Sequence, residues 1–522
     1  MQTNRLKASP KDSIELRPFL QKMVEKFPLD YAEAPACPKA NPLPNGSADC
    51  WCYSKDGALW MGGKRGVLRM AQEEYVRDNV QYFNGPRYLA DDAVKAIAPD
   101  GENGVWVWTE TGISHFYYKE MTMAEKASVY SARVVERQMR HGFVTSPHFV
   151  REDDFTEYHL ESEDNDGLWT AMYAASACYE YAVTGSQDAL ERAITTTKAV
   201  LSLVDVTGIK GYFARSFVTK DERLPEDGFW LAKDDGEVFW KSDTSSDEVV
   251  GHFMIYLIAY DLLPDEELKA KMRQTAADIV DYVIANDYYF IDVTGRPTMW
   301  GNWNLDYFNG RGYEDTFLNA AEMLTMVKVA AYLTGEERFE REYKKLAFDL
   351  GYADLCCTYL ARKEPTINYS DEELAYLTYL PLILLETDPE LLAKYKYGMG
   401  ELWRNIQREL NPLWTYIYKL LDPELDYDME GCLWTLRHLP LDLRGFSPNN
   451  TERDDLEFEE DVDRFGKRQI KTLLPPDERR IMKWNGTPFI PMDSGSPLYE
   501  ETGTIFTLPY WLGRYYGFLK GE

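Results

Sequence analysis

Acidic residues gather immediately before several strongly apolar stretches of the chain. Carboxyl groups that are brought together raise one another's pKa, and a protonated acid beside an ionised partner is the arrangement that cleaves glycosidic bonds. The four acidic segments contain Asp164 and Asp166, then Asp243, Asp247 and Glu248, then Glu314 and Asp315, and finally residues 371–373. The catalytic candidates are Asp166, Glu248, Asp164, Asp247, Glu314 and His252. Asp166 and Glu248 are the preferred pair.

Each acid, taken singly, also fits the start of a helix. Asp is favoured at the N-cap, where it stabilises a helix by about 1 kcal/mol, so Asp166 suits this role as well as catalysis. Ser245 with Glu248, and Ser370 with Glu373, have the spacing of a capping box. The segment that leads to Glu248 carries more acid than one cap needs, and this density favours a functional site.

His252 lies one helical turn after Glu248 on an otherwise apolar stretch. At this spacing the two side chains share a helix face, so they could exchange a proton or fix the imidazole tautomer. The alternative is a histidine satisfied within the core. No H-x-x-x-H pair accompanies His252, and Tyr173 stands where a calcium loop containing Gly167 would carry a glutamate. The sequence therefore predicts no metal and no cofactor.

The segment 294–315 is rich in glycine and aromatic residues. Exposed Trp side chains there would give a sugar ring a stacking surface, while Asn and Arg would bind its hydroxyls or a carboxylate. Alternatively, both Trp seal the loop onto the protein, and the acidic region after residue 436 is a solvated loop. The substrate-binding candidates are Trp169, Arg215, Trp300, Trp303, Asn309, Arg311, Tyr369, Arg444 and Arg453.

Two kinds of helical pattern alternate from residue 121 onward. The first kind is apolar on almost every face and has to be buried, whereas the second carries charge opposite an apolar stripe. The apolar stretches are 168–183, 249–263, 316–333, 374–385 and 505–519, with a weaker one at 413–436. The amphipathic stretches are 187–204, 265–284, 336–359 and 389–410, after a first helix that starts at Thr122 and runs to His141. Gly185 and Gly335 each follow a Thr and end an apolar helix.

This alternation predicts an (α/α)6-type toroid, complete or incomplete, with an inner ring of helices wrapped by an outer ring. The inner helices would run in one direction, so the four acidic segments should meet on one rim. Segments around Trp60 and Trp106 repeat with a period of 46 residues and look like β-propeller hairpins. Since two copies cannot close a propeller, we expect a small β-hairpin subdomain. The predicted domains are an extended arm at 1–50, this subdomain at 51–120 and the toroid at 121–522.

The Thr-Gly hairpins and the helix alternation over residues 120–520 resemble the (α/α)-toroid carbohydrate-active enzymes, which include glycoside hydrolases, polysaccharide lyases and sugar epimerases. The segment from Asp164 to Gly167 is loosely similar to the Asp-His-Asp-like loop of unsaturated glucuronyl hydrolases, with Asn165 in place of the His. The resemblance implies an oligosaccharide substrate.

The chain is strongly acidic, with 57 Lys and Arg against 87 Asp and Glu and a net charge of −30. Such a field repels nucleic-acid backbones and anionic lipids. No stretch has the uninterrupted apolar length of a membrane span, and the N-terminus lacks the pattern of a cleavable signal. We therefore expect a cytoplasmic protein that binds neither nucleic acid nor membrane.

Three functional hypotheses follow. The first is a glycoside hydrolase that acts on small oligosaccharides, including those with uronic acids. The second is a lyase that eliminates across a uronate, with a Tyr or His252 as the base, and an epimerase is a related alternative. The third is a non-catalytic glycan binder or sensor, prompted by the propeller-like repeat. Esterase, kinase and dinucleotide motifs are missing from the sequence.

Overall fold

The computed structural model describes residues 2–7, 43–44, 46–233, 236–358, 367–448, 450–483, 485–491 and 495–520. The chain divides into two compact units. Unit 1 comprises Met1–Thr122, Arg437–Met482 and Thr487–Tyr499, and unit 2 comprises Met123–Leu436, Lys483–Gly486 and Glu500–Glu522. Most of the arm expected at 1–50 lies outside the described residues, although β1 (Gln2–Lys7) pairs with a strand of unit 1. Residues 437–482 and 487–499, expected to belong to the helical domain, group with the N-terminal strands instead.

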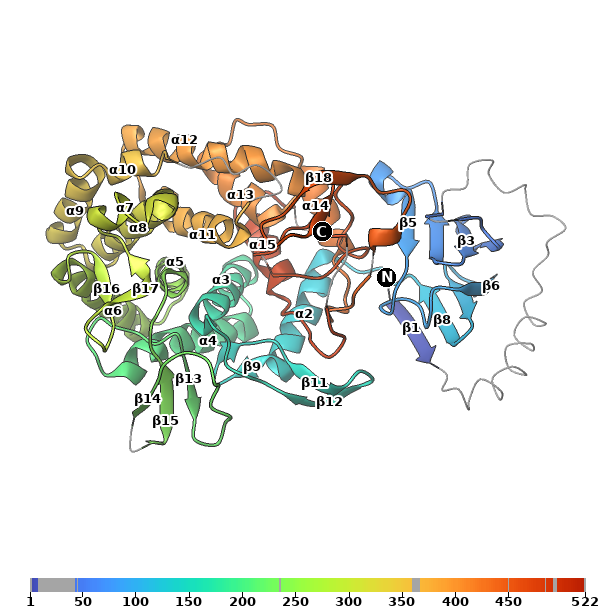
Figure 1. Ribbon diagram of the computed structural model, residues 1–522, viewed down its shortest axis with the longest axis horizontal. Helices are drawn as coiled ribbons and strands as arrows, with labels where there is room; N and C mark the ends of the chain where they lie inside the picture. The colour runs from blue at the N-terminus through green and yellow to red at the C-terminus, as the bar shows by residue number, and fades with distance from the viewer. Residues whose placement is uncertain are drawn as a thin grey trace. The chain divides into compact units, whose positions relative to one another are not determined.

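Unit 1 contains two four-stranded antiparallel sheets, drawn in blue in Figure 1. One sheet has the order β2 (Cys50–Tyr53), β3 (Leu59–Gly63), β4 (Gly66–Met70) and β5 (Val80–Phe83). The other has the order β1, β8 (Gly112–Tyr117), β7 (Val105–Thr109) and β6 (Val94–Pro99). Each copy of the repeat supplies two neighbouring strands, β3–β4 and β7–β8, so the expected β subdomain is present.

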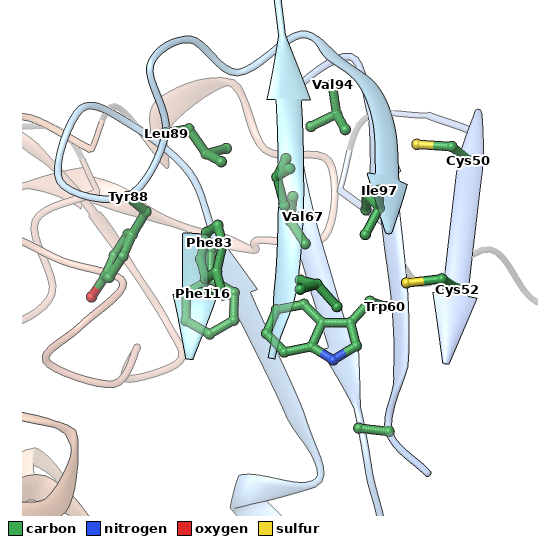
Figure 2. Packing of buried hydrophobic residues seen from close by; sticks show 13 residues of the cluster. Cys50, Cys52, Trp60, Val67, Phe83, Tyr88, Leu89, Val94, Ile97 and Phe116 are labelled. Carbon is green, nitrogen blue, oxygen red and sulfur yellow. The ribbon is translucent and has the colours of Figure 1, made fainter. Parts of the chain in front are cut away.

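The two sheets of unit 1 share one apolar core. Trp60, from β3, and Phe83, from β5, pack against Phe116 of β8, as Figure 2 shows. Alternating side chains of a strand point to opposite faces, so each sheet can bury one face against the other. The C-terminal part of the unit adds the hairpin β18 (Phe458–Val462) and β19 (Arg468–Ile470) and a short helical turn, η6 (Asn450–Glu452). Another short turn, η1 (Val76–Asp78), lies between β4 and β5.

Unit 2 is helical, and its apolar helices are buried on nearly every face. They are α3 (Asp166–Thr184), α5 (Ser246–Leu262), α8 (Thr316–Thr334), α11 (Tyr369–Leu385), α13 (Pro412–Leu421) and α15 (Thr504–Tyr515). Each of these helices contacts the next one in chain order, and α15 contacts α3. The apolar stretches predicted from the sequence are therefore confirmed as buried helices, although α15 ends four residues early.

The amphipathic helices lie between the apolar ones in the chain. They are α2 (Met123–Arg137), α4 (Gln187–Thr207), α6 (Glu266–Ala285), α9 (Glu337–Lys344), α10 (Tyr352–Leu355), α12 (Pro389–Ile406) and α14 (Met429–His438). The single helix expected at 336–359 is interrupted by a π-helical turn, η4 (Lys345–Asp349), and the weak helix at 413–436 is two helices. Gly185 and Gly335 end α3 and α8 with φ of 69° and 68°, as the Thr-Gly signals predicted.

Short hairpins precede several apolar helices, and the sequence analysis did not predict them. Their strands are β9 (Met139–Arg140), β10 (Phe143–Val144), β11 (His148–Arg151), β12 (Asp154–His159), β13 (Ser216–Thr219), β14 (Trp230–Lys233), β15 (Val238–Lys241), β16 (Tyr289–Ile291) and β17 (Pro297–Asn302). A four-residue helix, α7 (Leu305–Phe308), and a turn, η3 (Tyr313–Asp315), follow β17. Helix α2 stops at Arg137, before the expected His141, because the chain enters β9. In the part of the chain that the structure describes, no helix is long and apolar enough to cross a membrane.

Candidate functional site

Helices α3 and α5 meet through their first turns. A Cβ atom added at Gly251 would lie 2.7 Å from the Cα of Leu168, and one added at Gly167 would lie 1.9 Å from Glu248 Oε2. Neither position has room for a side chain, so the two backbones approach each other directly. This contact brings the acidic segments at 164–166 and 243–248 together, as the predicted rim requires.

Glu248 caps the neighbouring helix rather than its own. Its Oε1 accepts hydrogen bonds from the backbone N–H groups of Gly167 at 3.1 Å and Leu168 at 3.4 Å. These N–H groups belong to the first turn of α3, where they lack partners within the helix and favour a negative or polar group. The capping box expected at the start of α5 is not formed, because the Ser245 side chain accepts no hydrogen bond from the first turn of this helix. Burial raises the pKa of Glu248 well above its ordinary value, against the opposing charge of Arg215.

Asp166 is also fully buried, and it has several donors. Its Oδ2 accepts hydrogen bonds from Arg140 Nη2 at 2.7 Å and from the Ser216 hydroxyl, and its Oδ1 accepts one from the Glu163 N–H at 3.0 Å. Burial raises the pKa of Asp166, and Arg140 opposes the rise. Asp166 therefore joins α3 to the strands beside it. The preferred pair of the sequence analysis, Asp166 and Glu248, has no solvent-exposed member.

Asp164, Asp243 and Asp247 are the acids of these segments that meet solvent. The Asp164 side chain is 66% exposed and forms an ion pair with Lys241. Partial burial acts to raise the pKa of Asp164, but the hydrogen bond and charge of Lys241 outweigh it and lower the pKa. Asp247 is half-buried, and its pKa is raised by burial and by the charge of Asp164, with Arg215 opposing. Two interacting carboxyls are thus shifted in opposite directions, one toward an ionised base and the other toward a protonated acid.

Arg215 connects the two segments. Its Nε donates to the carbonyl oxygen of Asp164 at 3.0 Å, and its Nη2 donates to Asn165 Oδ1 at 2.9 Å. The Ser245 hydroxyl, at the start of α5, donates to the same Asn165 oxygen at 3.1 Å. Arg215 was expected to bind substrate. Its contacts make it first a residue that fixes the geometry between the segment before α3 and the segment before α5.

Two further buried carboxyls come from α8 and α11. Burial raises the pKa of both Glu322 and Glu373 well above the ordinary value, and the charge of Asp247 raises both further. Trp303 Nε1 donates to Glu322 Oε2 at 2.8 Å. Asp247 therefore interacts electrostatically with Asp164, before α3, and with carboxyls on α5, α8 and α11. Glu322 was not among the predicted residues, although a single Glu in the middle of an apolar helix is itself a signal.

A cleft in unit 2 lies beside the first turn of α3. It is lined by Val144, Trp169, Met172, Lys483, Thr502, Thr504 and Ile505. Lys483 Nζ lies 4.3 Å from the centre of the Trp169 ring and forms an ion pair with Glu163. Trp169 is half-buried, and this cleft is too small to admit a sugar ring. Lys483 was not predicted, because nothing near it in the sequence marks it.

The two Trp side chains of the segment 294–315 differ in their exposure to solvent. Trp300, on β17, is 48% exposed, whereas Trp303 is fully buried. The expectation that Trp303 offers a stacking surface is wrong, because its ring is enclosed and its N–H is used by Glu322. Asp243, in the left-handed region with φ of 54°, accepts a hydrogen bond from the Met299 N–H at 2.9 Å and so ties β17 to the segment before α5. Asn309, Arg311 and Glu314 are exposed, and Tyr369 is buried as the first residue of α11.

Arg444 and Arg453 belong to unit 1. The Arg444 guanidinium donates hydrogen bonds to both oxygens of the Asp442 carboxylate, and Arg453 binds Asp455 and, at 2.9 Å, Glu478. Both arginines are buried by these partners. We therefore correct their expected assignment from substrate binding to the internal structure of unit 1.

His252 is fully buried on α5. Its Nδ1 lies 2.6 Å from the Tyr256 hydroxyl, and its Nε2 lies 3.8 Å from Glu248 Oε2. Burial lowers the pKa of His252 to about 3. No group of three or more His, Cys, Asp or Glu side chains among the described residues has the arrangement of a metal site.

A comparison with protein-family models and with curated proteins returned no match for this chain.

Proposed function

We propose that unit 2 is an (α/α)6 toroid that hydrolyses glycosidic bonds of small oligosaccharides, with Asp247 as the general acid and Asp164 as the general base. The toroid is supported by the order of helix contacts, in which each apolar helix contacts the next and α15 contacts α3. Amphipathic helices alternate with these apolar helices along the chain, as in stacked α-hairpins.

The observation that carries the catalytic proposal is the pair of opposite pKa shifts at Asp247 and Asp164. In the reaction, Asp247 gives its proton to the oxygen of the leaving sugar as the bond from that oxygen to the anomeric carbon breaks. A water molecule attacks the same carbon and loses a proton to Asp164. Exchange of protons with solvent then restores both groups.

The surroundings of the pair fit a saccharide. Trp300 exposes an aromatic face on β17, which Asp243 ties to the segment before α5. Aromatic faces with a few polar groups are the usual composition of sugar-binding surfaces. The elimination hypothesis loses one of its expected bases, because His252 is fully buried and cannot reach a substrate.

The test is turnover of an oligosaccharide library by the Asp247→Asn and Asp164→Asn variants, followed by mass analysis. We expect each variant to lose about 10²- to 10⁴-fold in kcat, the usual contribution of a general acid or base. Asp227→Asn is the matched control, because Asp227 is as exposed as Asp164 and pairs with the same Lys241.

Full activity in both site variants, or an equal loss in the control, would contradict the assignment. Two other results would replace hydrolysis with another function. Products that absorb in the ultraviolet would indicate elimination, and tight saccharide binding without any product would indicate a glycan binder.

A further inference from the structure

Helix α5 carries three buried polar side chains in one line. Glu248, His252 and Tyr256 are four residues apart, so they lie on one helix face at successive turns. All three are fully buried. Burying a polar group without a hydrogen bond costs about 1–3 kcal/mol in proteins. The donors and acceptors of these three side chains therefore need hydrogen-bond partners inside the protein. We call these three residues the α5 line.

The unsatisfied atoms of the α5 line face each other. Within the described chain, Glu248 Oε2 and His252 Nε2 have no hydrogen-bond partner, and they are 3.8 Å apart. The other imidazole nitrogen, Nδ1, already contacts the Tyr256 hydroxyl at 2.6 Å. One proton between Glu248 and His252 would satisfy both atoms after a small side-chain rotation.

The groups around the α5 line decide where that proton resides. Glu248 faces Arg215, Asp166, Asp247 and the first N–H groups of α3. The imidazole of His252 is stacked on the Phe213 ring at 4.4 Å, and burial is the cause that acts on its titration. An imidazolium in this apolar surrounding is therefore strongly disfavoured.

Tyr256 keeps its proton, because burial raises its pKa as well. A neutral His252 can accept from Glu248 through Nε2 and donate to the Tyr256 oxygen through Nδ1–H. In this arrangement every member of the α5 line is uncharged, and both nitrogens of His252 are hydrogen-bonded.

We propose that the α5 line holds one proton on Glu248, through His252 Nε2, and so keeps Glu248 uncharged next to Asp247. An ionised Glu248 would add a second negative charge beside Asp247 and make that acid harder to ionise. Glu248 and His252 are then positioning residues that act on the reaction through Asp247. This consequence for activity rests on the proposed function, whereas the protonation of the α5 line does not.

The direct test is nitrogen NMR of the full chain labelled with ¹⁵N-histidine. The chain has 6 His, so the His252 signal can be identified as the one lost in His252→Phe. We expect a neutral imidazole with its proton on Nδ1 and no titration between about pH 5 and 9. A signal that titrates in this range, or one with the proton on Nε2, would overturn the proposal, because Nε2 would then not be the acceptor of the Glu248 proton.

The second readout is the pH profile of kcat/KM. His252→Phe removes the acceptor that stabilises protonated Glu248. The limb of the pH profile that reports the ionisation of Asp247 should therefore move to higher pH. Glu248→Gln keeps this position uncharged, so the profile should stay in place, and the double variant should lack the shift seen in His252→Phe. An equal shift in the single and double variants would contradict coupling through Glu248. If the NMR spectrum shows the expected neutral imidazole but Asp247→Asn is fully active, the proposed function is wrong. The proposed protonation of Glu248 is then still supported.

Discussion

Unit 1 and the rim of unit 2 both contain buried ionisable side chains, but these side chains differ in the partners that surround them. In unit 1, Arg453 lies between Asp455 and Glu478, and His438 lies between Asp78 and Asp477. At the rim of unit 2, Glu248, Glu322 and Glu373 each keep one oxygen without a hydrogen-bond partner among the described residues. In unit 1, Arg453 opposes the burial that raises the pKa of Glu478, whereas burial raises the pKa of the three rim carboxyls well above the ordinary value. The contrast distinguishes charges that stabilise a fold from charges available for chemistry.

The largest effect should come from breaking a matched cluster in unit 1. Arg453→Met leaves Glu478 and Asp455 without their cation, and removing one partner of a buried pair typically costs about 3–5 kcal/mol. The free energy of unfolding, measured by chemical denaturation, should fall by this amount. Arg65→Met is the control, because the pair of Arg65 with Glu452 is exposed and should contribute about 1 kcal/mol or less. Similar losses in both variants would contradict the distinction.

A smaller and pH-dependent effect is expected at His438. Burial alone would lower its pKa, but Asp477 and Asp78 outweigh burial and raise the pKa to about 9. Because the folded pKa exceeds the unfolded value, the stabilisation is fully present below the unfolded pKa and is lost as the pH rises through about 9. The shift corresponds to about 3 kcal/mol.

The variant His438→Gln tests this expectation. Arg437, which also pairs with Asp78, is retained in the variant, so the imidazole charge is the property that changes. Unfolding free energies of the two proteins should differ most near pH 6 and converge above about pH 9. A difference that stays constant with pH would show that packing, and not charge, accounts for the role of His438.

The smallest effect on stability is expected at the rim. Burial and the charge of Asp247 raise the pKa of Glu373 well above its ordinary value, against the charge of Lys483. The amide of Glu373→Gln resembles the neutral acid, so the unfolding free energy at pH 7 should change by less than about 1 kcal/mol or increase.

The stability difference between Glu373→Gln and the wild type should also depend on pH, with a sign that follows from the raised pKa of Glu373. The raised folded pKa makes wild-type stability greatest at low pH and lowers it as the pH rises above the unfolded value. Glu373→Gln lacks this dependence, so its stability relative to the wild type should increase as the pH rises from about 4. The matched variant in unit 1, Glu478→Gln, should instead be destabilised because Arg453 loses a charged partner. Equal destabilisation by both amides would remove the contrast between the two units.

The helices were predictable from the sequence because a helix that is buried on all faces contains few polar residues. The stretches that became α3, α5 and α8 lack a polar stripe, and Thr-Gly pairs mark the ends of two of them. The contact between the acidic segments at 164–166 and 243–248 also agrees with the rim predicted from the alternation of helix types. These features depend on local spacing, which a sequence displays.

The details of the site were less predictable because they depend on partners that are distant in the chain. Asp166 is bound by Arg140 and Ser216, which are 26 and 50 residues away. Trp300 and Trp303 share one glycine-rich segment, yet one is exposed and the other is buried and hydrogen-bonded to Glu322 of α8. The grouping of residues 437–482 with the N-terminal strands involves contacts such as that of His438 with Asp78, 360 residues apart.

The division of unit 1 into segments has a consequence for biosynthesis. Its N-terminal strands leave the ribosome early, but their partners at 437–482 and 487–499 follow only after most helices of unit 2 have been made. The contact of α15 with α3 is formed late for the same reason. Neither unit can complete its interior until these later segments have been made, so apolar strands and helices stay accessible to chaperones until then.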